Sequence, residues 1–451
     1  MSRTVPVRRC DEVPSTVLDS IRAWPSARRY WVACSGGPDS MALLAVIAAL
    51  RPDLPAPVAC VHVNHQLQPE ASAWESFVAR KCRGWHVPLH RLVVEIDGTG
   101  QEGPEGRARR ERYRAFSRLV GPGDLLLLAH HQDDQAETVL LRLFRGAGVR
   151  GLSGMPELRR LGEGWLGRPC LRLPRRLLRE YGVRAGAGGC RDPSNEDEAH
   201  RRNFIRHRVL PALTPWPAAP VVLARIADLQ REASGLLDEL AKRDLETVRG
   251  GGDGSLSVVR LSRFEEARAR NAIRFWLRLR GVPLPGCQET IRLVAAIRGH
   301  EPGSAKEIRW RGGVARFHRD RVYAARPEPV SPVVASMVWV PPSPVPCGGG
   351  VLRAARGVGR GLSIVRSKDI PFSVRARRGG ERMRVAGRGM TKSVKALLRE
   401  ADIPRWDRFH IPLVYAGDRL AAIPGVAYCE ALAATRLEPG WVLSWTSGGS
   451  P

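Results

Sequence analysis

The nine cysteines of this chain show no paired spacing, and this excludes several classes of protein. They lie at positions 10, 34, 60, 82, 170, 190, 287, 347 and 429, an odd number without any CxxC pair. Zinc ribbons and iron–sulfur sites built on paired cysteines depend on the CxxC spacing, and a disulfide framework is typical of an even number of cysteines, so the pattern argues against all three. The sequence therefore predicts a protein of a reducing compartment.

Long apolar segments are also missing. No run approaches the roughly 18 apolar residues of a membrane-spanning helix, and the N-terminal stretch MSRTVPVRRCDEV has no apolar core of signal-peptide length. We therefore expect a cytoplasmic protein with no membrane partner.

Acidic residues are scarce relative to basic ones. The chain has 72 Lys and Arg residues against 45 Asp and Glu, a formal net charge of +27 over 451 residues. An excess of this size indicates a polyanionic partner, with nucleic acid ahead of a membrane surface. A general enrichment in arginine is the alternative explanation. The length predicts two to four domains.

What the sequence does contain is a glycine loop between a strand-like run at 30–34 and an apolar, helix-like run at 41–50. The loop consists of Ser35, Gly36, Gly37, Pro38, Asp39 and Ser40. Two glycines let the backbone approach a ligand closely, and the helix N-terminus attracts anions, so the loop suits a phosphate. A bare anion does not suit Asp39, which we interpret as a ligand of a metal ion that accompanies the phosphate. The alternative is an ordinary turn with a serine cap.

Strand-like and helix-like stretches alternate from residue 30 to about residue 128. This alternation predicts parallel strands covered by helices, with ligands bound beyond the carboxyl ends of the strands. The loop at Ser35, the pair Asn64–His65 and the pair His130–His131 each follow a predicted strand. We therefore expect these three places to lie along one edge of the sheet.

The second informative stretch, AHHQDDQAET, opens a predicted helix. His131, Asp134 and Glu137 are spaced three residues apart and roughly share a helix face. Two carboxylates and an imidazole can hold Mg²⁺, hold an incoming cation or relay a proton. The alternative is that the acidic residues only cap the helix.

A basic helix precedes this stretch. Arg109, Arg112 and Tyr113 can face the same way, and arginine offers both a fork for phosphate and a plane for stacking. A solvated basic helix face is the alternative.

The domain organisation follows from changes in composition along the chain. We expect a catalytic domain at 1–215, a mainly helical domain at 216–326, a linker rich in proline and glycine at 327–349, and a small α/β domain at 350–451. The fold class is α/β, with a Rossmann-like parallel sheet in the first domain. The segment 182–190 is unusually rich in glycine, and the sequence leaves its local fold open.

Six motifs occur in a fixed order: SGGPDS, VNHQL, GRARRERYRAF, AHHQDDQAETVLLRLFRGAGVRGLSGM, RDPSN and RRNFIRHRVLPAL. Their order and approximate spacing resemble the tRNA(Ile)-lysidine synthases, which belong to the N-type ATP pyrophosphatases with their adenine nucleotide α-hydrolase-like fold. The stretch from Arg377 to Gly425 is also similar to the C-terminal domain of that family. The resemblance covers essentially the whole chain.

The resemblance implies a reaction and a set of partners. ATP would adenylate O2 of the wobble cytidine in a tRNA(Ile) with anticodon CAU and release pyrophosphate. Free L-lysine would then attack C2 and release AMP. Residues 216–451 would bind the rest of the tRNA. The oligomeric state stays open, with a homodimer as one alternative.

The resemblance also implies roles for the residues of the motifs. The loop residues would hold pyrophosphate, with Asp39 on Mg²⁺. His131 would line the reacting centre, where Asp134 and Glu137 would bind or deprotonate the lysine ammonium. Arg109 or Arg112 would contact the target nucleotide or the phosphates.

Three other functions compete with this one. A tRNA thiolase of the same class, such as one that makes 2-thiocytidine, would need sulfur-carrying cysteines. A small-molecule amide ligase would not need the charge of +27. A binding protein on an inactive scaffold would have lost the loop or a carboxylate, whereas Asp39, Asp134 and Glu137 are all present.

Overall fold

The protein is described by a computed structural model that covers residues 9–64, 70–94, 104–213, 215–216, 218–251, 253–301, 306–327 and 336–447. His65, which we expected at the sheet edge, lies outside these residues. The chain forms two compact units, Met1–Leu236 and Leu237–Pro451, whose division falls within the long helix α10 (Ala219–Val248). The domain limits expected from composition stay predictions, and each unit is described by itself.

The first unit is built on a six-stranded sheet with the strand order β3-β2-β1-β4-β6-β5. Neighbouring strands are parallel except for the antiparallel pair of β5 and β6. The strands are β1 (Arg29–Ala33), β2 (Val58–Asn64), β3 (Leu89–Val93), β4 (Asp124–Leu127), β5 (Leu158–Leu161) and β6 (Gly164–Gly167). The expected Rossmann-like parallel sheet is thus confirmed.

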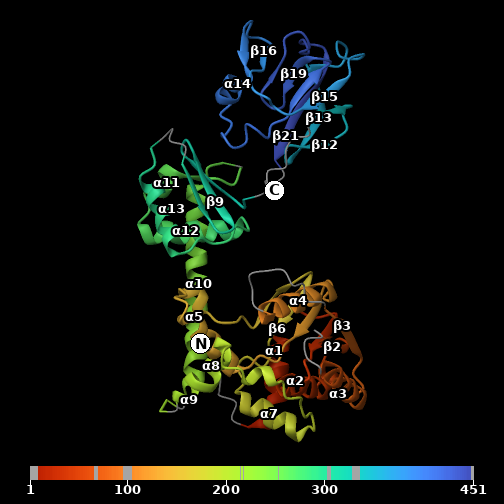
Figure 1. Cartoon of the computed structure of the whole chain (residues 1–451), viewed down its shortest axis with the longest axis vertical. Coiled ribbons are helices and arrows are strands. Elements are labelled where there is room, and N and C mark those ends of the chain that lie inside the picture. The colour runs from red at the N-terminus through yellow and green to blue at the C-terminus, as the bar shows by residue number, and fades with distance from the viewer. Residues whose placement is uncertain are drawn as a thin grey trace. The chain divides into compact units, whose positions relative to one another are not determined.

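Helices cover both faces of this sheet (Figure 1). One core gathers residues of α1, α2, α3 and α7, and a second core on the other face includes Phe116 in α4 and Val120 directly after it. Helix α2 is apolar all round, and every residue from Met41 to Ile47 is buried. These helices are α1 (Val13–Arg22), α2 (Pro38–Ala49), α3 (Ala71–Gly84), α4 (Pro104–Leu119), α5 (Gln132–Leu143) and α7 (Arg175–Arg184).

The order of the strands places a topological switch in the middle of the sheet. Strand β1 lies between β2 and β4, so the chain runs outward to β3 on one side and returns to β4 on the other. Polar loops that follow β1 and β4 therefore meet beyond the carboxyl ends of these two strands, where such sheets bind ligands.

Residues 151–210 are rich in Gly and Arg, a composition that favours irregular structure. This stretch nevertheless forms the hairpin of β5 and β6 and then α7. Short helical turns follow at Pro193–Glu196, Arg201–Phe204 (α8), Ile205–Val209 (η4, a π-helical turn) and Leu210–Ala212 (α9).

The second unit begins in α10, whose apolar residues recur at spacings of three and four, as is typical of an amphipathic helix. A mainly helical part follows, with a four-stranded antiparallel sheet in the order β7-β10-β9-β8. Its elements are β7 (Leu256–Ser257), α11 (Val258–Ser262), α12 (Glu266–Leu279), α13 (Cys287–Arg298), β8 (Glu307–Trp310), β9 (Gly313–His318) and β10 (Arg321–Ala325).

The C-terminal part of the second unit contains two larger antiparallel sheets and the single described helix α14 (Val394–Glu400). Two of its strands, β11 (Ser336–Trp339) and β12 (Val345–Cys347), lie within the stretch that we expected to be a linker. The other strands are β13 (Gly350–Val358), β14 (Leu362–Ser363), β15 (Phe372–Arg375), β16 (Arg382–Arg384), β17 (Thr391–Ser393), β18 (Leu413–Ala416), β19 (Arg419–Ile423), β20 (Ala427–Tyr428) and β21 (Pro439–Ser447). Among the described residues, no helix combines the length and apolar character that a bilayer crossing requires.

Candidate active site

The loop between β1 and α2 has the geometry of a phosphate cradle. Gly36 adopts a φ of +88°, which favours glycine, and Gly37 is the N-cap of α2. The hydroxyl of Ser40 donates to the carbonyl oxygen of Gly37 at 2.9 Å and accepts from the backbone N–H of Ser35 at 3.2 Å. The hydrogen bonds of Ser40 therefore close the loop against the start of α2. Backbone N–H groups and the positive end of the helix dipole favour a bound anion there.

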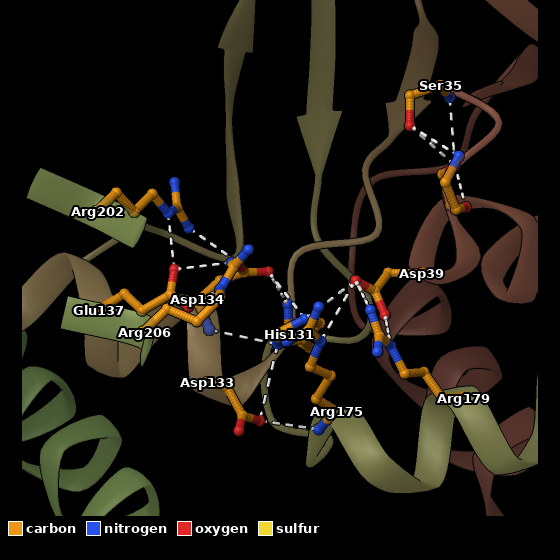
Figure 2. A network of polar contacts seen from close by, with 12 residues as sticks. Ser35, Asp39, His131, Asp133, Asp134, Glu137, Arg175, Arg179, Arg202 and Arg206 are labelled. Carbon is orange, nitrogen blue, oxygen red and sulfur yellow. Dashed lines mark hydrogen bonds and ion pairs between the residues drawn. The ribbon is translucent and has the colours of Figure 1, made fainter. Parts of the chain in front are cut away.

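Asp39, in the first turn of α2, is surrounded by two arginines and a histidine (Figure 2). Its carboxylate accepts a 2.7 Å hydrogen bond from Nε of Arg179, while Nε of Arg175 lies 3.5 Å away and Nε2 of His131 lies 3.6 Å away. Burial alone would raise the pKa of the Asp39 carboxyl, but the contacts with His131 and Arg179 outweigh burial and hold this pKa well below its ordinary value. Asp39 is therefore an ionised carboxylate beside the loop.

His131 joins this carboxylate to helix α5. The imidazole is buried and caps α5: its Nδ1 accepts from the backbone N–H of Asp134 at 3.3 Å, and the Asp134 side chain accepts from the backbone N–H of His131 at 3.1 Å. Nε2 of His131 also lies 3.3 Å from Oδ2 of Asp134. The capping role weighed against a catalytic one is thus real, and the capped geometry places the imidazole between the carboxylates of Asp39 and Asp134.

Glu137 completes the group and is 1% exposed. Its carboxylate accepts from Nε of Arg206 at 2.6 Å and from Nε of Arg202 at 2.7 Å. Arg202 also reaches Asp134, with Nη2 2.8 Å from Oδ1. Figure 2 shows both guanidinium groups directed at this carboxylate pair.

These contacts define a site for a cation. The pKa of Asp134 lies below its ordinary value although burial would raise it, because His131 and Arg202 stand beside the carboxylate. The two guanidinium groups occupy positions that an ammonium group could take, since both form charge-assisted hydrogen bonds with these oxygens. Asp134 therefore stays ionised, and the carboxyl groups of Asp134 and Glu137 are arranged to bind positive charge.

Arg109 belongs to a neighbouring cluster rather than to this network. Its guanidinium carbon lies 5.2 Å from the ring centroid of Tyr113, and that of Arg159 lies 5.3 Å away. Burial would raise the pKa of Tyr113, but the positive charges of Arg109, Arg168, Arg112 and Arg159 lower it. The cluster is therefore strongly cationic.

The cluster connects to the carboxylates through His130. Nε of the buried Arg168 lies 3.2 Å from Nδ1 of His130. Burial lowers the pKa of His130 to about 3. The positive charges of Arg168, Arg202 and Arg109 also lower this pKa, whereas the negative charge of Asp134 raises it. His130 is thus neutral and accepts the hydrogen bond from Arg168 at Nδ1.

The structure brings together most of the residues singled out from the sequence. The loop from Ser35 to Ser40 lies at the end of β1, and His131, Asp134 and Glu137 lie after β4. His131 lies within 3.6 Å of Asp39 and within 3.3 Å of Asp134, and Arg202 links Asp134 with Glu137. Arg109 and Arg112 act electrostatically on Tyr113.

Sequence reasoning assigned no role to four arginines of the network. Arg175 and Arg179 lie one helical turn apart on α7, and Arg202 and Arg206 have the same spacing in the turns after residue 200. Such a spacing puts two side chains on one face. These two pairs of arginines were therefore the sequence signal that could have identified the partners of the predicted carboxylates.

Comparison with known protein families covers most of the chain. A model described as PP-loop domain matches residues 12–213, one described as TilS substrate binding domain matches residues 256–323, and one described as TilS substrate C-terminal domain matches residues 372–445. The match to the first model contains every predicted site residue.

Solved structures with a likeness to this chain include the U34-tRNA thiolase NcsA from Methanococcus maripaludis with its 4Fe-4S cluster, at 14% identity and a TM-score of 0.42, covering 49% of this chain and 78% of that one. They also include a TILS C-terminal domain, at 27% identity and a TM-score of 0.21, covering 25% of this chain and 97% of that one. Both scores are low, so these likenesses add nothing to the assignment.

Curated relatives match along nearly their whole length. The tRNA(Ile)-lysidine synthase of Coxiella burnetii is 34% identical over 439 residues, covering 96% of each chain. That of Alkalilimnicola ehrlichii is 38% identical over 439 residues, covering 95% of this chain and 96% of the relative. With this identity over this length, the chain belongs to the tRNA(Ile)-lysidine synthase family.

Proposed function

We propose that this chain ligates L-lysine to C2 of the wobble cytidine of a tRNA(Ile) with anticodon CAU and uses ATP to do so. The observation that carries the proposal is the meeting of the phosphate loop after β1 with the carboxylates after β4. One side of the site suits an anion and the other side suits a cation, as a reaction between ATP and an amine requires.

The first step activates the base. O2 of the cytosine attacks the α-phosphorus of ATP, a P–O bond forms, and pyrophosphate leaves with the electron pair of the α–β bond. Backbone N–H groups of the loop between Ser35 and Ser40 hold the departing pyrophosphate. Arg109 or Arg112, in the cationic cluster around Tyr113, contacts the target nucleotide or the phosphates.

Mg²⁺ fits this site as a partner of the phosphates. No group of three or more His, Cys, Asp or Glu side chains among the described residues could hold a metal ion alone. One carboxylate together with phosphate oxygens is a normal arrangement for Mg²⁺, which would neutralise charge on the departing group. Asp39 would be that carboxylate, once Arg179 has released it.

The second step joins the amine. The ε-ammonium of lysine, with a reference pKa of ~10.4, has to lose a proton before it can attack. Asp134 and Glu137 bind the ammonium after Arg202 and Arg206 have moved aside, and one carboxylate accepts the proton. The amine nitrogen forms a bond to C2, the C2–O2 bond breaks, and AMP leaves with O2. The nitrogen now attached to C2 then releases its second proton to water.

The thiolase alternative shares only the phosphate loop with this proposal. It would transfer sulfur from a cysteine or a cluster, whereas the carboxylate pair of Asp134 and Glu137 suits an amine. We also infer that residues 216–451 bind the body of the tRNA, as the overall charge of +27 supports. We infer a cytoplasmic location, which a substrate set of ATP and tRNA supports.

The test is incorporation of labelled L-lysine into tRNA(Ile) with anticodon CAU by the purified full-length chain. We expect incorporation that depends on ATP and releases one AMP and one pyrophosphate per lysine. The control substrate is the same tRNA with its wobble cytidine replaced by uridine. Transfer of sulfur in place of lysine would overturn the proposal.

A further inference from the structure

Residues 182–190 run beside the phosphate loop. This segment starts within the last turn of α7 and has the sequence GVRAGAGGC. The backbone N–H of Cys190 donates a 2.8 Å hydrogen bond to the carbonyl oxygen of Gly36. The loop is therefore bonded to a segment far along the chain that has no role in the reaction described above.

Gly189 lies closer to the loop than a residue with a side chain could. A Cβ atom at this position would lie 2.7 Å from both the backbone N and the Cα of Pro38. Real Cβ atoms essentially never approach backbone atoms so closely. The φ of Gly189 is not positive, so its backbone conformation would accept a residue with a side chain. Glycine is required here because there is no space for a Cβ atom.

The segment is fastened on its other sides. A Cβ atom at Gly182 would lie 2.8 Å from Cβ of Ala42 in α2, which shows how closely the two helices pack. The N–H of the buried Ala187 donates to the carbonyl oxygen of Gly182 at 2.8 Å. Nζ of Lys81 in α3 donates to the carbonyl oxygen of Gly186 at 2.5 Å. The segment is thus a fixed support.

The hydrogen bond to Gly36 also fixes the direction of the next N–H group. The carbonyl of Gly36 and the N–H of Gly37 belong to one planar trans peptide and point in opposite directions. Because Cys190 holds the carbonyl, the N–H of Gly37 is directed away from Cys190, and it reaches Oγ of Ser35 at 3.3 Å. Two adjacent glycines would otherwise sample many orientations of this peptide.

We propose that residues 186–190 are a backbone brace that holds the Gly36–Gly37 peptide with its N–H directed into the loop, where it bonds to Oγ of Ser35 until the pyrophosphate of ATP takes its place. Gly189 and Cys190 are positioning residues: they touch the loop and do not touch the reacting atoms. This proposal rests on the proposed use of ATP by the loop. It gives the glycine-rich segment the task of keeping the anion site formed before ATP arrives.

The test is Gly189→Ala in the full-length chain. The added methyl group has to push Pro38 and the brace apart, which weakens the bond between Cys190 and Gly36. We expect the Kd values for ATP and for inorganic pyrophosphate, measured by isothermal titration calorimetry, to rise about fivefold to tenfold, as for one weakened hydrogen bond. The Kd values for L-lysine and for the tRNA should stay unchanged.

The matched control is Gly84→Ala at the end of α3. It adds the same methyl group, and a Cβ atom there meets nothing within 4 Å, so ATP binding should stay as in the unmodified chain. Equal ATP affinity in the Gly189→Ala variant and the unmodified chain would overturn the brace alone. Loss of lysine and tRNA binding together with ATP binding would also overturn it, because the effect would be general. Failure of the unmodified chain to bind either ATP or pyrophosphate would overturn the proposed function as well.

A second measurement needs no substitution. Hydrogen exchange at the amide of Cys190 should slow when pyrophosphate binds to the unmodified protein, because an ordered loop keeps the Gly36 carbonyl in place. Exchange at the amide of Trp85, which donates to Lys81 at the end of α3, should not change. Unchanged exchange at Cys190 would overturn the proposal even if the Gly189→Ala variant failed to fold.

Discussion

Glu137 offers the sharpest test of the charge network, because it is almost fully buried and has two cationic partners. The substitution Glu137→Gln keeps the shape of the side chain and removes its charge. Three hydrogen bonds from guanidinium nitrogens are affected, at 2.6, 2.7 and 3.0 Å. Breaking a buried ion pair by removing one partner costs about 3–5 kcal/mol.

The expected cost is smaller than that range because the partners are not fully buried. The side chains of Arg202 and Arg206 are 29% and 18% exposed, so each can turn toward water, and Asp134 still pairs with both. We therefore expect the free energy of unfolding to fall by about 2–3 kcal/mol. Urea unfolding of the full-length chain, followed by tryptophan fluorescence, measures this loss.

The matched control is Glu198→Gln in the same region. Glu198 pairs with Arg208, and their side chains are 37% and 66% exposed, so this surface pair should contribute about 1 kcal/mol or less. An equally small fall in the free energy of unfolding of the two variants would refute the reasoning.

In activity assays, Glu137→Gln should abolish lysine incorporation while pyrophosphate release from ATP in the presence of tRNA persists.

Further expected outcomes concern the anion side, acid and the tRNA. Asp39→Asn should abolish turnover while tRNA binding persists, and near-normal turnover would remove Asp39 from the Mg²⁺ site. Arg179→Ala should lower the Mg²⁺ concentration needed for half-maximal ATP binding in calorimetry, because a competing cation leaves the carboxylate; an unchanged requirement would contradict this. The lowered pKa values of Asp39 and Asp134 stabilise the fold above their unfolded pKa of ~4. This stability is lost as the pH falls through the lower folded values, so unfolding followed by circular dichroism should become easier below about pH 4, and a flat profile there would be inconsistent with the network. Deleting 350–451 should weaken tRNA binding more than ATP binding, with a shallower dependence of tRNA affinity on salt; equal tRNA affinity would assign that part another task.

Local patterns were enough to predict the anion loop and the carboxylate helix. The pattern from Ser35 to Ser40 contains its own turn and helix start, and His131 to Glu137 contains its own cap, so both are readable from neighbouring residues. Parallel strands and helices followed from alternating apolar runs. The β5–β6 hairpin was missed because its tight turn at Gly162 lies in a stretch whose many glycines and arginines resemble a loop.

Contacts between distant segments could not be predicted in this way. Arg179 meets Asp39 across 140 residues of sequence, and Arg202 meets Glu137 across 65. Such pairs depend on how α7 and α8 return to the sheet, which packing decides and local pattern does not. The sequence pattern indicated the carboxylates, and only the fold showed that arginines are their partners.

The central position of β1 has a consequence for protein synthesis. The phosphate loop is made early, but its supports come late: β4 is needed beside β1, α7 brings Arg179, and Cys190 bonds to Gly36 only after both. A growing chain that ends before Cys190 therefore has the loop without the groups that hold it. Because domains generally fold as units during synthesis, we expect the nascent protein to bind ATP only after nearly the whole first unit has left the ribosome.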